Sequence, residues 1–440
     1  MSRQTPLVLL LTGFLCAPSL VAGQDYQKSL PGDAAQQPAA PMGLAGGSGQ
    51  MLGDIPGLTA NTPPPHWIVP GLRLTYYTLS GFLPGGPHEY TPDPKGTWED
   101  QHGNRYAQHE LHGSGSHGLL QFNVVGMDQQ QVAVQTLFYL YDGMDTSAPT
   151  QRAETGYATH AGNGGDLWLH PDALKALLQK YGNQPGPTRG QSGMWVMATQ
   201  RQIEQVTYDA VLIILLAQSG SRKMWFYDLA SGVLLYSSEL SKASETVVQG
   251  TTQIHPGGSM TKHTTFKGSR TLSLPWAGQA APPWLGQART FRYRGSFQVN
   301  TPGSPPTPMV FNAAATVVAR GPDWVRFEVT TGGDQAPGIQ SELTSRVGGN
   351  HMLCGSWIPP TAIAALQPGQ ILDTDNFTHV TTQVASVDSQ YVTLVHNNAR
   401  QQIQYTYRRQ DGLLVRTLSN DRFNELNMSN QVEFSLTSVE

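Results

Sequence analysis

The sequence predicts a mainly β protein, of the β-rich α+β class, with two related antiparallel curved sheets that each carry one short helix. Three observations support this prediction. Short runs of β-branched and aromatic residues alternate with turn residues, two stretches have the character of a helix, and features of the N-terminal half recur in the C-terminal half. We therefore expect a tandem duplication of one β-meander.

Strand patterns are clearest in the C-terminal half. Residues 390–396, 401–408 and 413–418 are rich in β-branched and aromatic side chains, and Asn397-Asn398 and Asp411-Gly412 between them favour tight hairpins. Apolar and polar side chains alternate within 401–408, as in a sheet with one face towards solvent. The same pattern occurs in the N-terminal half, in residues 194–199, 205–218, 223–229 and 233–238.

Each half contains one predicted helix. The first begins at Pro171, which suits a first helical turn, and ends at Gly182. The apolar residues between them follow the i, i+3, i+4, i+7 spacing of a single buried stripe. The second helix is shorter, with Ile363 and Leu366 before Pro368 stops it. Each helix is expected to close one end or face of its sheet.

The duplication is predicted from similar features that occur in the same order in both halves. Residues 168–177 align with residues 357–366 at an offset of 189, and each segment begins with a tryptophan that we expect in the core. Further similarities keep this order: Trp67 with Trp284, Val124 and Val132 with Val317 and Val325, and Tyr227 and Gly232 with Tyr407 and Gly412.

The N-terminus predicts export. Residues 1–23 contain Arg3, the apolar run 7–15 and small residues before Gln24, which together are typical of a cleaved signal peptide. The apolar run is shorter than the about 20 residues that span a bilayer, and no transmembrane segment is predicted in the mature chain. Residues 24–65, rich in Ala, Gly, Gln and Pro, are predicted to form a disordered tether. We expect a periplasmic or secreted protein.

Beyond the tether we expect a first β-rich half at residues 66–240, a connecting segment at 241–285 and a second half at 286–440. Removal of the signal with Cys16 leaves Cys354 as the one cysteine, so an internal disulfide is excluded. Cys354 could serve as a nucleophile or an intermolecular bridge, but its apolar neighbours favour a small buried side chain.

The composition excludes one class of partner. Charged residues make up 13% of the 440 residues and the formal net charge is −4, so the polarity comes from Gln, Asn, Ser and Thr. Such a chain has no basic field to attract phosphate groups. Nucleic acid is therefore not expected as a partner.

A histidine-rich loop at residues 88–117 is the densest polar cluster. Neutral imidazoles with a carboxylate suit Zn²⁺, Cu²⁺ or Ni²⁺, although the spacing is not that of a helical metalloprotease, and the glycines around the histidines are typical of a solvated loop. This loop contains His88 and the candidate metal ligands His102, His109, His112 and His117.

Two further patterns are incomplete. Ser259 and Lys262 have the Ser-x-x-Lys spacing of some acyl-transferring enzymes, but the other elements of that site are missing. Asp373 and Asp375 resemble the start of a calcium loop, but Phe377 stands where a third oxygen ligand belongs. The sequence thus identifies no catalytic residue and no cofactor.

We therefore predict an exported, non-catalytic binding or carrier protein, or a scaffold in an envelope assembly. An apolar ligand or an envelope protein is the expected partner, and the sheet faces and the cleft between the halves are the expected binding places. Two alternatives stay open: a metal-dependent hydrolase that uses the loop 88–117, and a structural surface protein. The ligand and the oligomeric state are not specified by the sequence.

Overall fold

The protein is described by a computed structural model. The described residues are 55–59, 61–84, 91–92, 97–99, 105–107, 115–142, 145–182, 192–217, 221–243, 246–247, 254–255, 258–287, 290–303, 306, 308–332, 343–423 and 428–440. The predicted signal peptide and residues 24–54 of the predicted tether lie outside these ranges.

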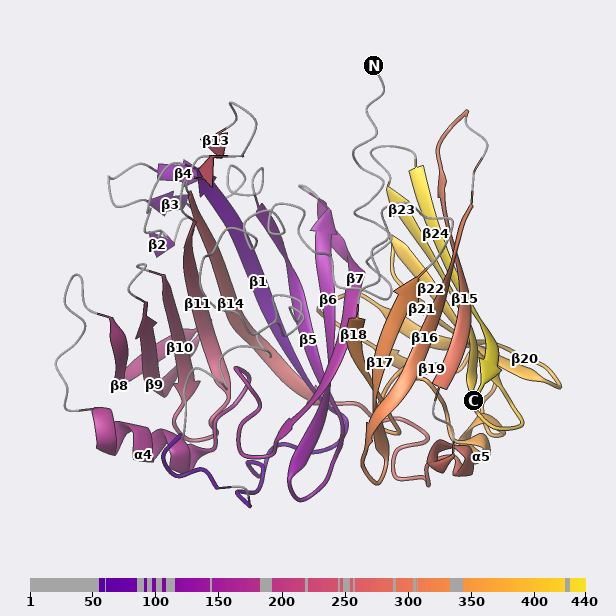
Figure 1. The fold of residues 1–440 in the computed structure, drawn as a ribbon, viewed down its shortest axis with the longest axis horizontal. Helices are drawn as coiled ribbons and strands as arrows, with labels where there is room; N and C mark the ends of the chain where they lie inside the picture. The colour runs from indigo at the N-terminus through magenta and orange to yellow at the C-terminus, as the bar shows by residue number, and fades with distance from the viewer. Residues whose placement is uncertain are drawn as a thin grey trace.

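The first half is a nine-stranded antiparallel sheet (Figure 1). Helix α4 (Pro171–Tyr181) joins β7 to β8, which lie at opposite edges of the sheet. In sheet order the strands are β7 (Asp145–His160), β6 (Gln131–Asp142), β5 (Gly115–Met127), β1 (Leu72–Pro84), β14 (Gly258–Thr271), β11 (Leu234–Ala243), β10 (Arg222–Asp228), β9 (Val206–Leu216) and β8 (Gly193–Ile203). Small sheets are formed by β2 (Thr91–Pro92), β3 (Thr97–Glu99) and β4 (Arg105–Ala107), and by β12 (Thr246–Val247) and β13 (Ile254–His255).

The second half is a ten-stranded antiparallel sheet. A 3-10 helix at Pro283–Gly286 precedes it, and helix α5 (Pro360–Ile363) lies between β18 and β19. In sheet order the strands are β18 (Leu343–Gly349), β17 (Trp324–Gly332), β16 (Met309–Arg320), β15 (Thr290–Asn300), β24 (Met428–Val439), β23 (Leu414–Phe423), β22 (Gln401–Arg408), β21 (Tyr391–Asn397), β20 (Thr381–Val387) and β19 (Ile371–Thr374).

The two large sheets share one topology. In each, three strands follow the first strand outwards to one edge, a helix crosses to the far edge, and the chain returns until its last long strand pairs with the first. The second sheet adds only the short edge strand β19 to this order. The predicted fold class, two related antiparallel sheets each with one short helix, is confirmed, and the shared topology fits a tandem duplication.

Equivalent side chains stabilise both halves. The buried Trp168 and Trp357 stand before the two helices and pack edge-on against a second tryptophan, as expected for core residues. Two hydrogen bonds also have equivalents in both halves. The indole of Trp67 donates to Ser231 O, as that of Trp284 does to Asp411 O, both at 2.7 Å. The hydroxyl of Tyr227 donates to Asp166 O at 3.1 Å, as that of Tyr407 does to Gly355 O at 2.8 Å.

In each half, the main core lies on the sheet face that the helix covers. In the first half, Ala173, Leu174 and Leu177 of α4 belong to the same buried cluster as Trp168 and Tyr76. Because side chains alternate between the two faces of a strand, the neighbours of Tyr76 on β1 point to the opposite face. That opposite face meets the second half.

Two segments lie within the fold although we expected them outside it. Residues 258–271, part of the predicted connecting segment, form β14, which pairs with β1 and β11 in the middle of the first sheet. At the end of the predicted tether, Ile55 is buried and Leu58 packs against the first core. Strand β14 was not predicted because its sequence is rich in Thr, Lys and Gly and lacks a clear alternation of apolar and polar residues.

The halves meet along β7 and β18, which lie beside each other in the middle of Figure 1. Their backbones approach closely at Gly156, where an added Cβ would lie under 3.0 Å from the Val347 nitrogen. Val125 and Ala133 of the first sheet form a small buried cluster with Trp324 and Val347 of the second. The two sheets thus pack directly together.

Candidate functional site

A pocket of about 110 Å³ lies on the inner face of the second sheet, and Glu154 of the first half completes its lining. Its walls are mainly apolar and aromatic, and strands β15, β16, β17, β18, β22, β23 and β24 all contribute. The lining residues are Glu154, Phe291, Tyr293, Ala313, Ala315, Phe327, Val329, Arg346, Val347, Met352, Cys354, Gly355, Ser356, Tyr405, Leu414, Thr417 and Phe434.

The segment 352–356 closes the pocket on one side and is held in place by its backbone. Tyr407 Oη donates to the Gly355 carbonyl at 2.8 Å, and the Leu414 amide donates to the Ser356 carbonyl at 3.0 Å. The Trp276 indole donates to the Met352 carbonyl at 3.4 Å. Because the wall is anchored by buried side chains, the pocket is preformed rather than made by a loose loop.

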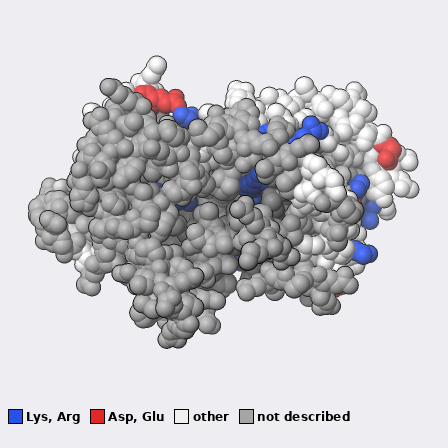
Figure 2. Space-filling model, turned by 90° about the horizontal axis from the view of Figure 1, so that it is seen from above, with Lys and Arg blue, Asp and Glu red and all other residues white. Residues whose placement is uncertain are grey.

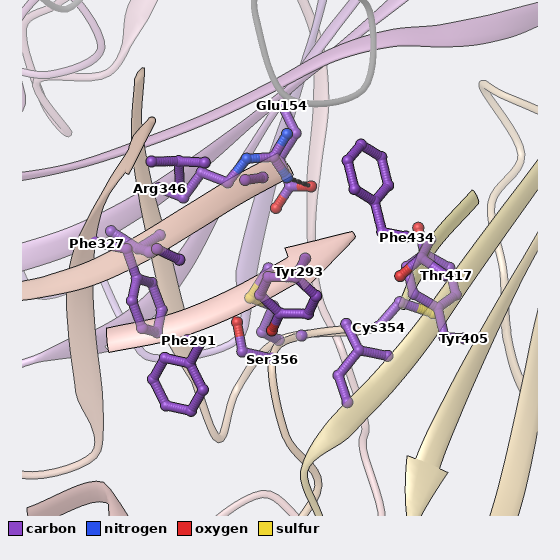
Figure 3. Close-up of a pocket in the computed structure, with 17 residues that line it drawn as sticks. Glu154, Phe291, Tyr293, Phe327, Arg346, Cys354, Ser356, Tyr405, Thr417 and Phe434 are labelled. Atoms are coloured by element: carbon purple, nitrogen blue, oxygen red, sulfur yellow. Dashed lines mark hydrogen bonds and ion pairs between the residues drawn. The ribbon is translucent and has the colours of Figure 1, made fainter. Parts of the chain in front are cut away.

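One end of the pocket is charged. Arg346 Nη1 donates to Glu154 Oε2 at 2.6 Å, and the two side chains are 17% and 18% exposed. Figure 3 shows this pair together at one end, with Phe291 and Ser356 towards the other. Glu154 comes from β7 of the first half and Arg346 from β18 of the second, so both halves build this end.

The Glu154 carboxylate stands at one end of a buried chain of hydrogen bonds that crosses the first sheet. Its Oε1 accepts from Gln135 Nε2 at 2.9 Å, and Gln135 Oε1 accepts from Asn123 Nδ2 at 2.7 Å. Asn123 Oδ1 in turn accepts from Arg73 Nε at 2.7 Å. Three neighbouring strands therefore fix the position of Glu154 through side-chain contacts.

Arg73 ends this chain at an acidic cluster of the second half. Asp375 Oδ2 accepts from Arg73 at 3.1 Å, from Gln121 at 3.0 Å and from Arg270 at 3.0 Å. Arg270 also binds both oxygens of Asp373, at 2.6 and 2.7 Å. The two carboxylates that resembled the start of a calcium loop thus bind arginines of the other half.

Electrostatics keep Asp375 ionised. Burial alone would raise the pKa of its carboxyl, but the charge of Arg73, the amide of Thr378 and the Arg270 guanidinium together outweigh burial. The pKa of Asp375 therefore lies well below its ordinary value. The same pair of carboxylates, Asp373 first, raises the pKa of Arg270.

Cys354 lines the pocket and is partly buried. Burial, and then the negative charge of Glu154, raise the pKa of its thiol well above the ordinary value. The thiol is therefore protonated near neutral pH, which agrees with a packing role and not with that of an activated nucleophile. Its backbone has a φ of 56°, which a non-glycine residue adopts only when its surroundings hold it there.

The histidine-rich loop lies largely outside the described residues. His88, His102, His109 and His112 are not among them, whereas His117 is buried on β5. The His117 ring stacks on Tyr141, and its Nδ1 lies 3.2 Å from Tyr77 Oη. Within the described part of the chain no group of three His, Cys, Asp or Glu side chains could hold a metal ion. The metal site stays a prediction.

Lys262 lies on strand β14 and not on a helix. The Ser-x-x-Lys pattern requires a helix to place its two groups side by side, so the local structure does not support that site. Among the described helices, none is long and apolar enough to cross a membrane.

The described surface that is seen from above carries few charged side chains. In the view from above, Lys, Arg, Asp and Glu are scattered over a mainly uncharged surface in the described residues (Figure 2). This agrees with the low proportion of charged residues, 13%.

Sequence reasoning did not identify the pocket or its charged end. Phe291 and Tyr293 stand two apart on β15, as do Phe327 and Val329 on β17, and this alternation was the available signal for an apolar inner face. Glu154 is one of several polar residues in β7, and nothing in the local pattern distinguishes it.

No protein-family model matches the sequence, and no curated protein is significantly similar to it. Among solved structures, a protein of unknown function from the DUF3598 family of Nostoc punctiforme is 10% identical, with a TM-score of 0.15, over 84% of this chain and 96% of that one. The complex of MucA and MucB of Pseudomonas aeruginosa is 9% identical, with a TM-score of 0.18, over 83% and 89%. Similarities at this level carry no information about function.

Proposed function

We propose that the protein is a non-catalytic binding or carrier protein that holds a small apolar group in the pocket of its second half. The observation that supports this most directly is the lining, in which aromatic and aliphatic side chains from seven strands surround one preformed space. A dry cavity of about 150 Å³ lined by Leu, Ile and Phe binds benzene. A pocket of about 110 Å³ suits one small ring or the end of one alkyl chain.

The predicted signal peptide and tether complete the proposal. Residues 1–23 would direct the chain to the periplasm or the exterior, and the tether would hold the folded halves away from a surface. A carrier in such a compartment would transfer or store an apolar compound that water dissolves poorly. The roles as an envelope scaffold, a structural surface protein or a metal-dependent hydrolase stay open predictions.

Titration of the full chain with 1-hexanol tests the proposal. Met352 lines the pocket, so the ¹³C NMR signal of its methyl group, assigned as the one lost in Met352→Leu, should shift and saturate as the alcohol binds. Ala315→Leu should fill the pocket and weaken binding at least about tenfold, which corresponds to about 1.4 kcal/mol.

Ala314→Leu is the matched control. Ala314 precedes Ala315 on the same strand, points to the other face and does not line the pocket, so this variant should bind like the wild type. An unchanged Met352 signal at saturating alcohol, or equal loss of binding in both alanine variants, would overturn the proposal.

A further inference from the structure

The charged end of the pocket suggests which apolar compounds it accepts. Among the lining residues, Glu154 and Arg346 are the two that carry a full charge. Burial raises the pKa of the Tyr293 and Tyr405 hydroxyls and of the Cys354 thiol, so those groups are neutral. One negative and one positive charge at 2.6 Å leave the pocket without net charge.

Glu154 cannot readily turn towards a new partner. Both of its oxygens accept hydrogen bonds, Oε1 from Gln135 and Oε2 from Arg346. Gln135 is itself fixed by Asn123, so a movement of Glu154 would disturb the buried chain behind it.

A charged group that entered the pocket would lose its water without gaining a net counter-charge. Burying an unpaired charge costs far more than burying an uncharged polar group, whereas a hydroxyl can be satisfied by one hydrogen bond. A carboxylate would meet Glu154 beside Arg346, and an ammonium group would meet Arg346 beside Glu154. The attraction and the repulsion nearly cancel in both cases.

We propose that the Glu154–Arg346 pair makes the pocket select uncharged apolar compounds, such as alcohols, over carboxylates and amines of the same size. This inference rests on the proposed function. Each half contributes one member of the pair, so this selectivity arises only where the halves meet. Glu154 and Arg346 are then specificity-determining residues of the binding site.

Three compounds of equal chain length test the selectivity at pH 7: 1-hexanol, hexanoate and hexylammonium, each titrated against the Met352 methyl signal. The wild type should bind 1-hexanol at least about tenfold more tightly than either ion, a difference of about 1.4 kcal/mol. Glu154→Gln leaves Arg346 uncompensated and should improve hexanoate binding about tenfold. Arg346→Gln should do the same for hexylammonium, and the double variant should again prefer the alcohol.

Asp421→Asn is the matched control. Asp421 pairs with Arg152 at 3.1 Å across the same junction, with side chains 13% and 15% exposed, but neither residue lines the pocket. This variant should weaken the junction without changing the preference among the three compounds.

The outcomes separate the two proposals. If 1-hexanol fails to bind the wild type, the proposed function is wrong. If 1-hexanol binds but hexanoate and hexylammonium bind equally well, or if Glu154→Gln and Asp421→Asn have the same effect on the preference, the selectivity proposal is overturned while the binding function stands.

Discussion

Gly232 and Gly412 occupy equivalent positions in the two halves, and both have a positive φ, 80° and 76°. Each lies close to a carbonyl oxygen of the segment that precedes the helix of its half. An added Cβ would lie well under 3.0 Å from Leu169 O in the first half and from Ile358 O in the second. The same pairs of residues are also hydrogen bonded, since the Leu169 amide donates to Gly232 O at 3.0 Å and the Ile358 amide to Gly412 O at 2.9 Å. Each glycine therefore allows a hairpin turn to pack closely against the segment that precedes a helix.

Replacing either glycine with alanine should destabilise the protein. Gly232→Ala and Gly412→Ala each combine an unfavourable φ with a backbone clash, and we expect a loss of about 2 kcal/mol or more in the free energy of unfolding. Gly278→Ala is the control, because Gly278 has a φ of 78° with nothing within 4 Å of the added Cβ, so only the conformational cost of about 1 kcal/mol applies. Equal losses in all three, measured by chemical denaturation, would contradict the role of the clash.

The ion pair of Arg73 and Asp375 joins residues 302 positions apart and should stabilise the junction of the halves. Arg73→Gln removes one partner of a buried carboxylate, and we expect a loss of about 3–5 kcal/mol in unfolding free energy at pH 7. Glu204→Gln, which removes an exposed pair with Lys267, should cost less than about 1 kcal/mol. If the two variants lose the same free energy of unfolding, the buried pair contributes no more to stability than the exposed pair does.

Acid should remove the stabilisation that the ionised Asp375 gives to the folded protein. Its pKa is lower in the folded protein than its ordinary value of 3.8, so the unfolded chain takes up the proton first as the pH falls. The stabilisation is therefore present above about pH 4 and is lost progressively below it. Denaturation at a series of pH values should show a flatter acid limb for Asp375→Asn than for the wild type. Identical slopes would count against this assignment.

His396 should make stability depend on pH in a higher range. Burial, and then the charge of Arg73, lower the pKa of this histidine to about 4, although Asp373 and Asp375 act in the opposite sense. The unfolded chain binds the proton near pH 6.5, so stability should fall as the pH drops from 6.5 towards 4, by up to about 3 kcal/mol.

The variant His396→Gln should lose this part of the pH dependence, measured as unfolding free energy at pH 7 and pH 4.5. The buried His263, whose pKa is also lowered to about 4, keeps its own contribution in that variant. His66→Gln, at an exposed position, is the control and should leave the difference unchanged. If His396→Gln shows the same difference in unfolding free energy between pH 7 and pH 4.5 as the wild type, the prediction is wrong.

Cys354 should react slowly with alkylating reagents. Because burial and Glu154 raise the pKa of the thiol, little thiolate is present at pH 8, and modification should be at least about tenfold slower than in the chain unfolded in urea. Bound 1-hexanol should slow it further, since Cys354 lines the pocket. Peptide mass spectrometry at Cys354 measures the rate, and a rate equal to that of the unfolded chain would show that the thiol is exposed.

Local patterns predicted much of the architecture. The alternation in 401–408, the turn at Asp411-Gly412 and the start of α4 at Pro171 each depend on neighbouring residues, and the structure places all three as expected. The correspondence of Trp168 with Trp357 was predicted from their order along the chain. In the structure each tryptophan forms an equivalent β-bridge, Trp168 with Val233 and Trp357 with Leu413.

The candidate site could not be found in this way. Glu154 and Arg346 are 192 residues apart, and no local pattern distinguishes either of them from the other polar residues of its strand. In the sequence Asp375 resembled only the start of an incomplete calcium loop, and the packed halves show that it pairs with Arg73 and Arg270.

The sequence by itself thus determined the β class, the repeated order of strands and helices, and the turns, because these depend on side-chain alternation and local backbone preference. Only the tertiary structure decided which face of each sheet would be covered, where a pocket would remain, and which charges would meet. Those depend on how two folded sheets pack, and the free energy of that packing is distributed over contacts between residues far apart in the chain.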